Sequence, residues 1–271
     1  MLIDTHCHLN FKAFKKDLHQ IIERAKAKGV TKIIIPGAKL DSSQEAVRIS
    51  QLYPACFAAV GIHPHHTKDF IEDNSEKLNQ ARLKELTPLL KGKKTVAVGE
   101  IGLDRYQYKD RPPLAKSDIE GQTALFTYQL DLAVKFNLPV IIHSRQAIDD
   151  VIAIIENYIK KGKNIHGVFH CFEGNENHLN KAINLGFYVG FDGNVTYEEN
   201  GKLRSLVKYA PLNRILIETD APFLTPVPFR YTRNEPSYLP FIAQIIADIH
   251  KLTKQDVAYT ISTNARKLFK I

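Results

Sequence analysis

The chain has 271 residues, of which 44% are hydrophobic and 24% charged, and its formal net charge is +8. This is enough apolar material for one sizeable core, and no run of about 18 apolar residues, the length that spans a membrane, occurs. The positive charge is compatible with a polyanionic partner, although lysines on solvated helix faces account for it equally well. The N-terminus does not resemble a signal peptide, and three cysteines without C-x-x-C spacing favour a reducing compartment. We therefore expect a cytoplasmic protein without membrane insertion.

Short apolar runs alternate along the chain with segments of helical periodicity. Strands are expected at 2–8, 32–37, 56–62, 95–98, 139–142, 167–169, 187–191 and 215–217. Helices are expected at 17–28, 41–52, 75–91, 118–136, 147–160, 177–185, 203–209, 239–250 and 254–268. The stretch 104–116 is expected to be an irregular, charged loop.

The strand runs are nearly continuous in hydrophobicity, which is typical of strands buried on both faces in parallel sheets. Eight strand–helix units in about 250 residues predict a (β/α)₈ TIM barrel. Because no linker or change of composition interrupts the chain, residues 1–271 are interpreted as one domain. An open doubly wound sheet is the alternative, but its polar residues would gather at one switch point rather than at many strand ends.

The polar residues at these strand ends predict a metal centre. Alternate side chains of a strand share a face, so His6 and His8 would point the same way. Four later strands end in polar groups that would converge on the same mouth of a barrel: Glu100, His143, His170 and Asp220. Four imidazoles and two carboxylates suit divalent cations of intermediate hardness. Six ligands exceed the need of one catalytic zinc and fit two cations bridged by Glu100.

Other residues near these ends have predicted supporting roles. Asp220 is also a candidate general base, because a carboxylate beside the reacting water could take its proton. His63, and less directly His65, could donate to a phosphoryl or leaving oxygen, which makes His63 catalytic together with Asp220 and Glu100. Glu218 would lie one layer deeper and support a ligand. Asp104 is expected either to orient a ligand or to cap a turn.

Substrate contacts are predicted less directly. Arg145 follows His143 and could contact a phosphate or form a salt bridge at a helix start. Three more candidates for substrate binding lie in the loop after the last strand: Arg230, Arg233 and Asn234.

Eight motifs occur in order along the chain: IDTHCH, GIHPH, VGEIGLD, IIHSR, FHCF, ETDAPFLTP, RNEPSYL and NARKLF. Together they resemble the TatD family of metal-dependent hydrolases, a branch of the amidohydrolase-like TIM barrels. The resemblance implies deoxyribonuclease activity, with 3′–5′ exonuclease action on DNA. It also implies that His6 and His8 hold one cation with Glu100 and Asp220, and that Glu100, His143 and His170 hold the second.

We thus expect a monomeric phosphodiesterase that acts on DNA with water activated by two cations, whether Mg, Mn or Zn. One rival is an amidohydrolase that cleaves a C–N or C–O bond in a small molecule or aminoacyl ester. Glu100 stands where such barrels often carry a modified lysine, which argues against it. A second rival is a non-catalytic binding or export-associated protein, and the complete ligand set argues against that.

Overall fold

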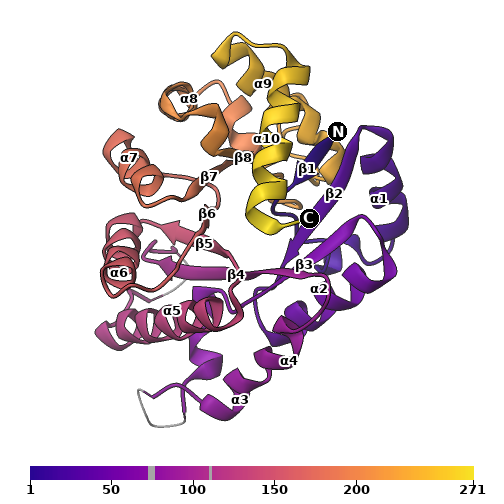
Figure 1. The fold of residues 1–271 in the computed structure, drawn as a ribbon. Helices are drawn as coiled ribbons and strands as arrows, with labels where there is room; N and C mark the ends of the chain where they lie inside the picture. The colour runs from indigo at the N-terminus through magenta and orange to yellow at the C-terminus, as the bar shows by residue number, and fades with distance from the viewer. Residues whose placement is uncertain (73–76, 110–111) are drawn as a thin grey trace.

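The structure is a computed structural model that describes residues 1–72, 77–109 and 112–271. Its centre is a single sheet of eight strands in the order β1 to β8, and each neighbouring pair is parallel. The strands are β1 (Leu2–Asp4), β2 (Val30–Pro36), β3 (Cys56–Val60), β4 (Thr95–Asp104), β5 (Val140–Arg145), β6 (Gly167–Phe169), β7 (Tyr188–Phe191) and β8 (Ile215–Ile217). The predicted (β/α)₈ architecture is confirmed (Figure 1).

The first and last strands meet just beyond their carboxyl ends. The Asp220 amide donates to the His6 carbonyl at 2.9 Å, and the His8 amide donates to the Ala221 carbonyl at 2.8 Å. These bonds continue the ring of strands between β8 and β1. They also fix the backbone of three predicted metal ligands at the barrel mouth.

Helices surround the strands, and their apolar faces pack inward. They are α1 (Leu18–Ala27), α2 (Leu40–Leu52), α3 (Gln80–Lys84), α4 (Leu86–Leu90), α5 (Lys116–Phe136), α6 (Ile148–Lys160), α7 (Glu176–Asn184), α8 (Gly201–Tyr209), α9 (Leu239–His250) and α10 (Lys254–Phe269). Short 3₁₀ segments are η1 (Lys12–Phe14), η2 (Pro64–Phe70), η3 (Gly193–Thr196), η4 (Leu212–Arg214) and η5 (Pro236–Tyr238). In α6 the buried residues Val151, Ile152, Ile155 and Tyr158 recur at helical spacing, which places one stripe against the sheet.

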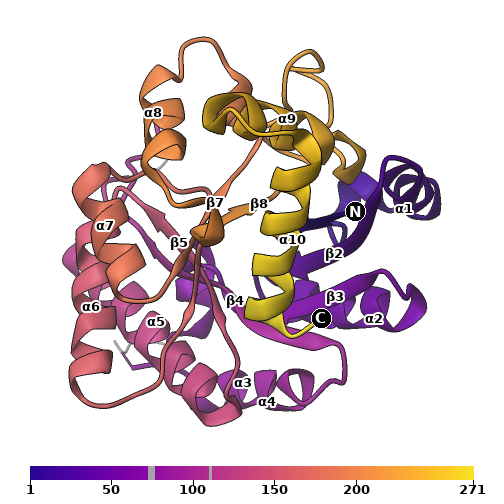
Figure 2. The same cartoon turned by 45° about the horizontal axis from the view of Figure 1, so that its top comes forward.

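The end of the barrel opposite the mouth is closed by α10 (Figure 2). Its side chains Leu268 and Phe269 pack against the residues that fill the barrel interior, such as Ile3 and Ile141. Asn264 donates from α10 to the carbonyl of Ile215, the first residue of β8, at 2.9 Å. The apolar plug therefore lies where the strands begin, and the polar residues gather where they end.

Some predicted boundaries were wrong. The expected helix at 75–91 is two short helices that meet at Glu85, because Pro88 has no amide to continue the ladder back to Lys84; residues 75 and 76 lie outside the described part. β1 ends at Asp4, and β4 extends to Asp104, so Asp104 belongs to a strand rather than to a loop. Within the described residues, no helix has the length and hydropathy needed to cross a membrane.

Candidate metal centre

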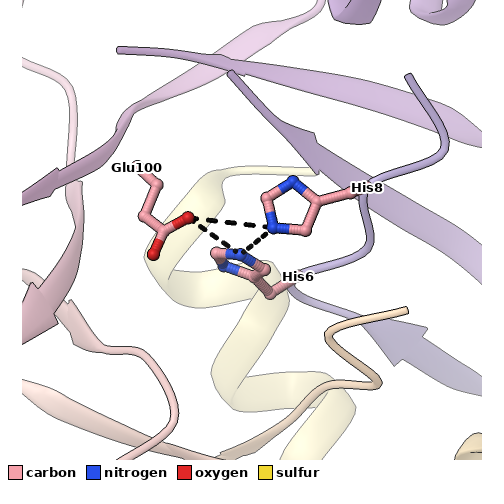
Figure 3. Close-up of side chains that lie close together, drawn as sticks. All are labelled: His6, His8 and Glu100. Carbon is pink, nitrogen blue, oxygen red and sulfur yellow. Dashed lines mark hydrogen bonds and ion pairs between the residues drawn. The ribbon is translucent and has the colours of Figure 1, made fainter. Parts of the chain in front are cut away.

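Glu100 lies at the middle of a cluster of imidazoles at the barrel mouth, and its side chain is buried. Its Oε2 atom lies 3.5 Å from His6 Nε2 and 3.8 Å from His8 Nε2 (Figure 3). Its Oε1 atom lies 3.0 Å from His143 Nδ1 and 3.7 Å from His170 Nε2. The two carboxylate oxygens therefore face two different sets of nitrogen atoms, as a bridging ligand would.

Asp220 completes the set on the side of His6 and His8. Its Oδ1 atom lies 3.4 Å from His8 Nε2 and 3.7 Å from His6 Nε2. Asp220 has a φ of 51°, in the left-handed region, which costs a non-glycine residue about 1–3 kcal/mol. The bond from its amide to the His6 carbonyl holds this conformation and directs the carboxylate at the two imidazoles.

The donor set fits divalent cations. The Nε2 atoms of His6 and His8 lie 3.2 Å apart, so both could reach one cation. The Nδ1 atoms of both rings are buried and have no hydrogen-bond partner among the described residues. In each of three groups of residues, the possible ligand atoms lie within 4.8 Å of one another; the groups are His6–His8–Glu100, His6–His170–Glu218 and His63–Glu100–His143. Mixed imidazole and carboxylate donors of this kind are typical ligands of zinc and manganese.

The carboxylates of the cluster are held in the charged form. Burial opposes the charge on Glu100, but the surrounding imidazoles His63, His6 and His143, two of which hydrogen-bond to it, keep the pKa of Glu100 well below the ordinary value. Burial likewise opposes ionisation of Asp220, and the hydrogen bond from His8 is the main contact that keeps the pKa of Asp220 low. The mouth therefore presents negative charge to a cation.

Glu218 orients His170. The Glu218 Oε1 atom accepts from His170 Nδ1 at 2.9 Å and from the Cys171 amide at 2.7 Å, and the carboxylate is fully buried. Burial lowers the pKa of His170, but the charge of Glu218 outweighs this and raises it to about 10. A Cβ atom at Gly190 would lie 2.5 Å from Glu218 Oε1, so only glycine leaves room for the carboxylate. With Nδ1 engaged, His170 directs Nε2 at Glu100, and a cation there would displace a proton.

Asp104 orients His143 in the same way from the other side. Its Oδ2 atom accepts from His143 Nε2 at 3.1 Å, from His65 Nε2 at 2.8 Å and from the Tyr108 hydroxyl at 3.0 Å. Burial lowers the pKa of His143, but its bonds to Asp104 and Glu100 raise it to about 9. Because Nε2 is engaged, Nδ1 is the His143 nitrogen that faces the centre.

Although one of its ring nitrogens belongs to one of the three groups of possible ligand atoms, His63 is bonded as a hydrogen-bond donor toward the centre. Its Nδ1 atom accepts from the His65 amide at 3.2 Å. Burial holds the pKa of His63 well below its usual value, so the ring is neutral. A neutral imidazole that accepts at Nδ1 carries its proton on Nε2, and this atom lies 3.5 Å from Glu100 Oε1.

Comparisons with known proteins place this site in a family. A sequence model of the family described as TatD related DNase matches residues 3–270. The chain belongs to the TatD family. It is 39% identical over 271 residues to the uncharacterized metal-dependent hydrolase YabD of Bacillus subtilis, with both chains covered completely. It is 33% identical over 276 residues to the 3'-5' ssDNA/RNA exonuclease TatD of Edwardsiella piscicida, again with full coverage of both.

The crystal structure of YjjV, a TatD homologue from Escherichia coli, superposes on this chain with a TM-score of 0.87 at 30% identity, covering 100% of this chain and 98% of that one. The protein is thus a metal-dependent hydrolase of the TatD family, on the predicted barrel.

In this TatD-family chain a cavity of about 520 Å³ opens above the centre. Tyr108 and Arg145 form one wall, and Phe11, Phe223 and Leu224 form another. His65 also lines the cavity, as predicted for a substrate contact. Nothing in the sequence analysis pointed to Phe11 or Phe223, although they follow the predicted ligands His8 and Asp220 by three residues each.

Arg145 faces this cavity, where its NH1 atom donates to the Tyr108 hydroxyl at 3.0 Å and its guanidinium lies 4.0 Å from the centre of the Tyr106 ring. The guanidinium therefore lines the cavity above the predicted metal ligands. Arg145 contacts Tyr106 and Tyr108 rather than forming the salt bridge at a helix start that was the alternative prediction.

The other three predicted substrate contacts do not line the cavity. Arg230 pairs with Glu199, and Arg233 pairs with Asp17. Asn234 is fully buried and donates to two backbone carbonyls. Their side chains are engaged within the protein, so the geometry does not support a direct contact with substrate.

Proposed function

We propose that this protein is a two-metal phosphodiesterase that removes nucleotides from the 3′ end of DNA. The observation that carries the proposal is Glu100, whose two oxygens face two separate sets of imidazole nitrogens at the floor of one cavity. A shared carboxylate of this kind is typical of centres that hold two cations.

In this proposal, His6, His8, Glu100 and Asp220 hold one cation, and Glu100, His143 and His170 hold the other. When bound by these residues, the cations would acidify a water and neutralise charge on the phosphoryl oxygens. The ligands are compatible with Mg, Mn or Zn.

The remaining chemistry belongs to side chains of this chain. Asp220 accepts the proton of the attacking water, since its carboxylate is ionised and faces the centre. His63 donates its Nε2 proton to the leaving oxygen, because its Nδ1 atom accepts from the His65 amide and the proton is therefore on Nε2. Arg145, on the cavity wall, pairs with a non-bridging phosphate oxygen.

Two further facts support a nucleic-acid substrate. A relative that matches the whole chain is named as a 3'-5' exonuclease of single-stranded DNA and RNA. The net charge of +8 also favours association with a polyanion. We propose that the protein acts as a monomer in the cytoplasm.

The test is hydrolysis of single-stranded DNA labelled at its 5′ or its 3′ end. Protein stripped of metal is supplied with Mg, Mn or Zn, alongside the Asp220→Asn variant. We expect metal-dependent shortening of the strand from its 3′ end. The cleavage rate should be about 100-fold or more lower in Asp220→Asn, because this substitution removes both the general base and the charge of one metal ligand.

The matched control is Asp248→Asn, which changes an exposed carboxylate on α9 and should cleave like the wild type. Cleavage by Asp220→Asn at the wild-type rate would refute the assigned role. Absence of DNA cleavage by protein that binds two cations would instead favour hydrolysis of a C–N or C–O bond, to be tested on a panel of amides and esters.

A further inference from the structure

The cavity above the metal centre has an apolar wall that the chemistry at the metal ligands does not require. Phe223 and Phe11 stand on this wall, and Phe223 is 51% exposed. The two rings meet edge to face, with centroids 6.3 Å apart. A half-exposed phenylalanine leaves apolar surface in contact with water unless a ligand covers it.

The backbone of Phe223 is held by hydrogen bonds to neighbouring segments. Its amide donates to the Asp220 carbonyl at 2.9 Å, and its carbonyl accepts from Asn234 Nδ2 at 2.6 Å. The same Asn234 amide group donates to the Thr219 carbonyl at 2.7 Å. Asn234 thus ties the backbone of Phe223 to the segment that carries Asp220. An exposed ring on so constrained a backbone is preorganised for contact.

The aromatic wall adjoins the predicted ligand His8. The Phe11 ring stacks on the His8 ring at 4.3 Å, and the Phe223 ring centre lies 6.4 Å from that of His8. A planar group resting on Phe223 and a phosphodiester at the metal centre are therefore near enough to belong to one nucleotide.

The charged side chains that line the cavity are the carboxylates of Glu100, Glu173 and Asp220 and the guanidinium of Arg145, and of these the guanidinium suits a phosphate. Arg145 lies on another wall of the same cavity. Lys12, Lys15 and Lys16, in and just after η1, follow Phe11 directly and are all exposed. An aromatic platform next to basic side chains is the arrangement by which proteins hold single strands, with bases stacked and phosphates paired.

We propose that Phe223, supported by Phe11, stacks on the base of a nucleotide next to the scissile phosphodiester. This rests on the proposed nuclease function and deepens it, because stacking on a ring in the cavity needs a base that is not paired in a duplex. Asn234, predicted as a substrate contact, acts instead as a positioning residue for Phe223.

The test compares 5′-labelled single strands that carry either normal nucleotides or a tetrahydrofuran abasic site at the last or the penultimate position. One aromatic contact per base predicts that the wild type prefers the normal strand to at least one abasic strand by about 5- to 150-fold in kcat/KM. In Phe223→Leu, which keeps an apolar side chain without a ring, this ratio falls toward one. Phe223→Trp, which restores a ring, restores the preference.

The matched control is Tyr259→Leu, which removes an aromatic ring that is 74% exposed on α10, away from the cavity. It should keep the wild-type ratio. A wild type indifferent to the missing base, or a Phe223→Leu variant with the wild-type ratio, would overturn the proposal.

A second measurement separates this proposal from the nuclease function itself. A strand with 2-aminopurine at its 3′ end and slowly hydrolysed phosphorothioate linkages is mixed with metal-loaded protein. We expect the base fluorescence to be quenched by the wild type and by Phe223→Trp, and not by Phe223→Leu. Quenching without DNA cleavage would refute the nuclease alone, and equal quenching by the wild type and Phe223→Leu would refute the stacking.

Discussion

Asp104 offers a demanding test of how the metal centre is built. Its carboxylate is buried and accepts four hydrogen bonds, from His143 Nε2, His65 Nε2, the Tyr108 hydroxyl and the Tyr106 amide. In Asp104→Asn the single amide oxygen accepts two donors at most, so at least two of the four lose their acceptor. At about 0.5–1.5 kcal/mol for each hydrogen bond lost by these partly buried donors, the free energy of unfolding should fall by about 1–3 kcal/mol.

The same substitution should weaken cation binding, because His143 loses the partner that directs its Nδ1 atom at Glu100. Loss of a carboxylate that supports a metal-bound imidazole typically lowers metal affinity by about 10- to 100-fold. Urea unfolding measures the first effect, and competition with a metal-chelating dye measures the second.

Asp69→Asn is the matched control for this experiment, because Asp69 also pairs with an imidazole, His66, but at an exposed position. It should change neither quantity by much. If Asp104→Asn bound cations as tightly as the wild type, or lost no more stability than Asp69→Asn, the positioning role of Asp104 would be wrong.

Three further substitutions and one labelling experiment test other parts of the structure. Glu100→Gln keeps the shape of the side chain but removes the charge shared by both ligand sets, so elemental analysis of dialysed protein should find at least one cation fewer per chain. Unchanged metal content would contradict the role of Glu100 as a bridging ligand. Asn234→Ala removes the donor of a buried bond to the Thr219 carbonyl and of a partly buried bond to the Phe223 carbonyl, and should lower the free energy of unfolding by about 1–3 kcal/mol in urea. Unchanged stability would argue that Asn234 does not hold the backbone of Phe223. Burial raises the pKa of the Cys56 thiol to about 12, so at pH 8 it is a neutral thiol and a disulfide reagent should modify it only after unfolding; rapid labelling of folded protein would disprove its burial. Phe269→Ala should cost about 3–5 kcal/mol of stability yet keep the metal content, and lost cations would show that the plug and the mouth are coupled.

The fold could be predicted because its signals are local. Each strand is a short apolar run, each helix has its own periodicity, and eight such units have few ways to bury both faces of every strand. Boundaries depended on more distant contacts, which explains why β1 is shorter and β4 longer than their hydrophobic runs.

The sequence by itself determined which side chains gather at the mouth. His170 and Asp220 lie just beyond the ends of β6 and β8, whereas Glu100 and His143 lie within the carboxyl-terminal halves of β4 and β5, and these parts of the strands converge in any barrel. This topological rule needs no knowledge of side-chain partners.

Only the tertiary structure decided how those side chains are used. Asp104 and His143 are 39 residues apart in the chain, and Glu218 and His170 are 48 apart, yet these contacts select the nitrogen that each imidazole turns to the centre. The same holds for Arg233, whose partner Asp17 lies near the other end of the chain. Hydrogen bonds and ion pairs are chosen among groups that folding brings together, so local pattern shows which groups are available and the folded chain decides which of them pair.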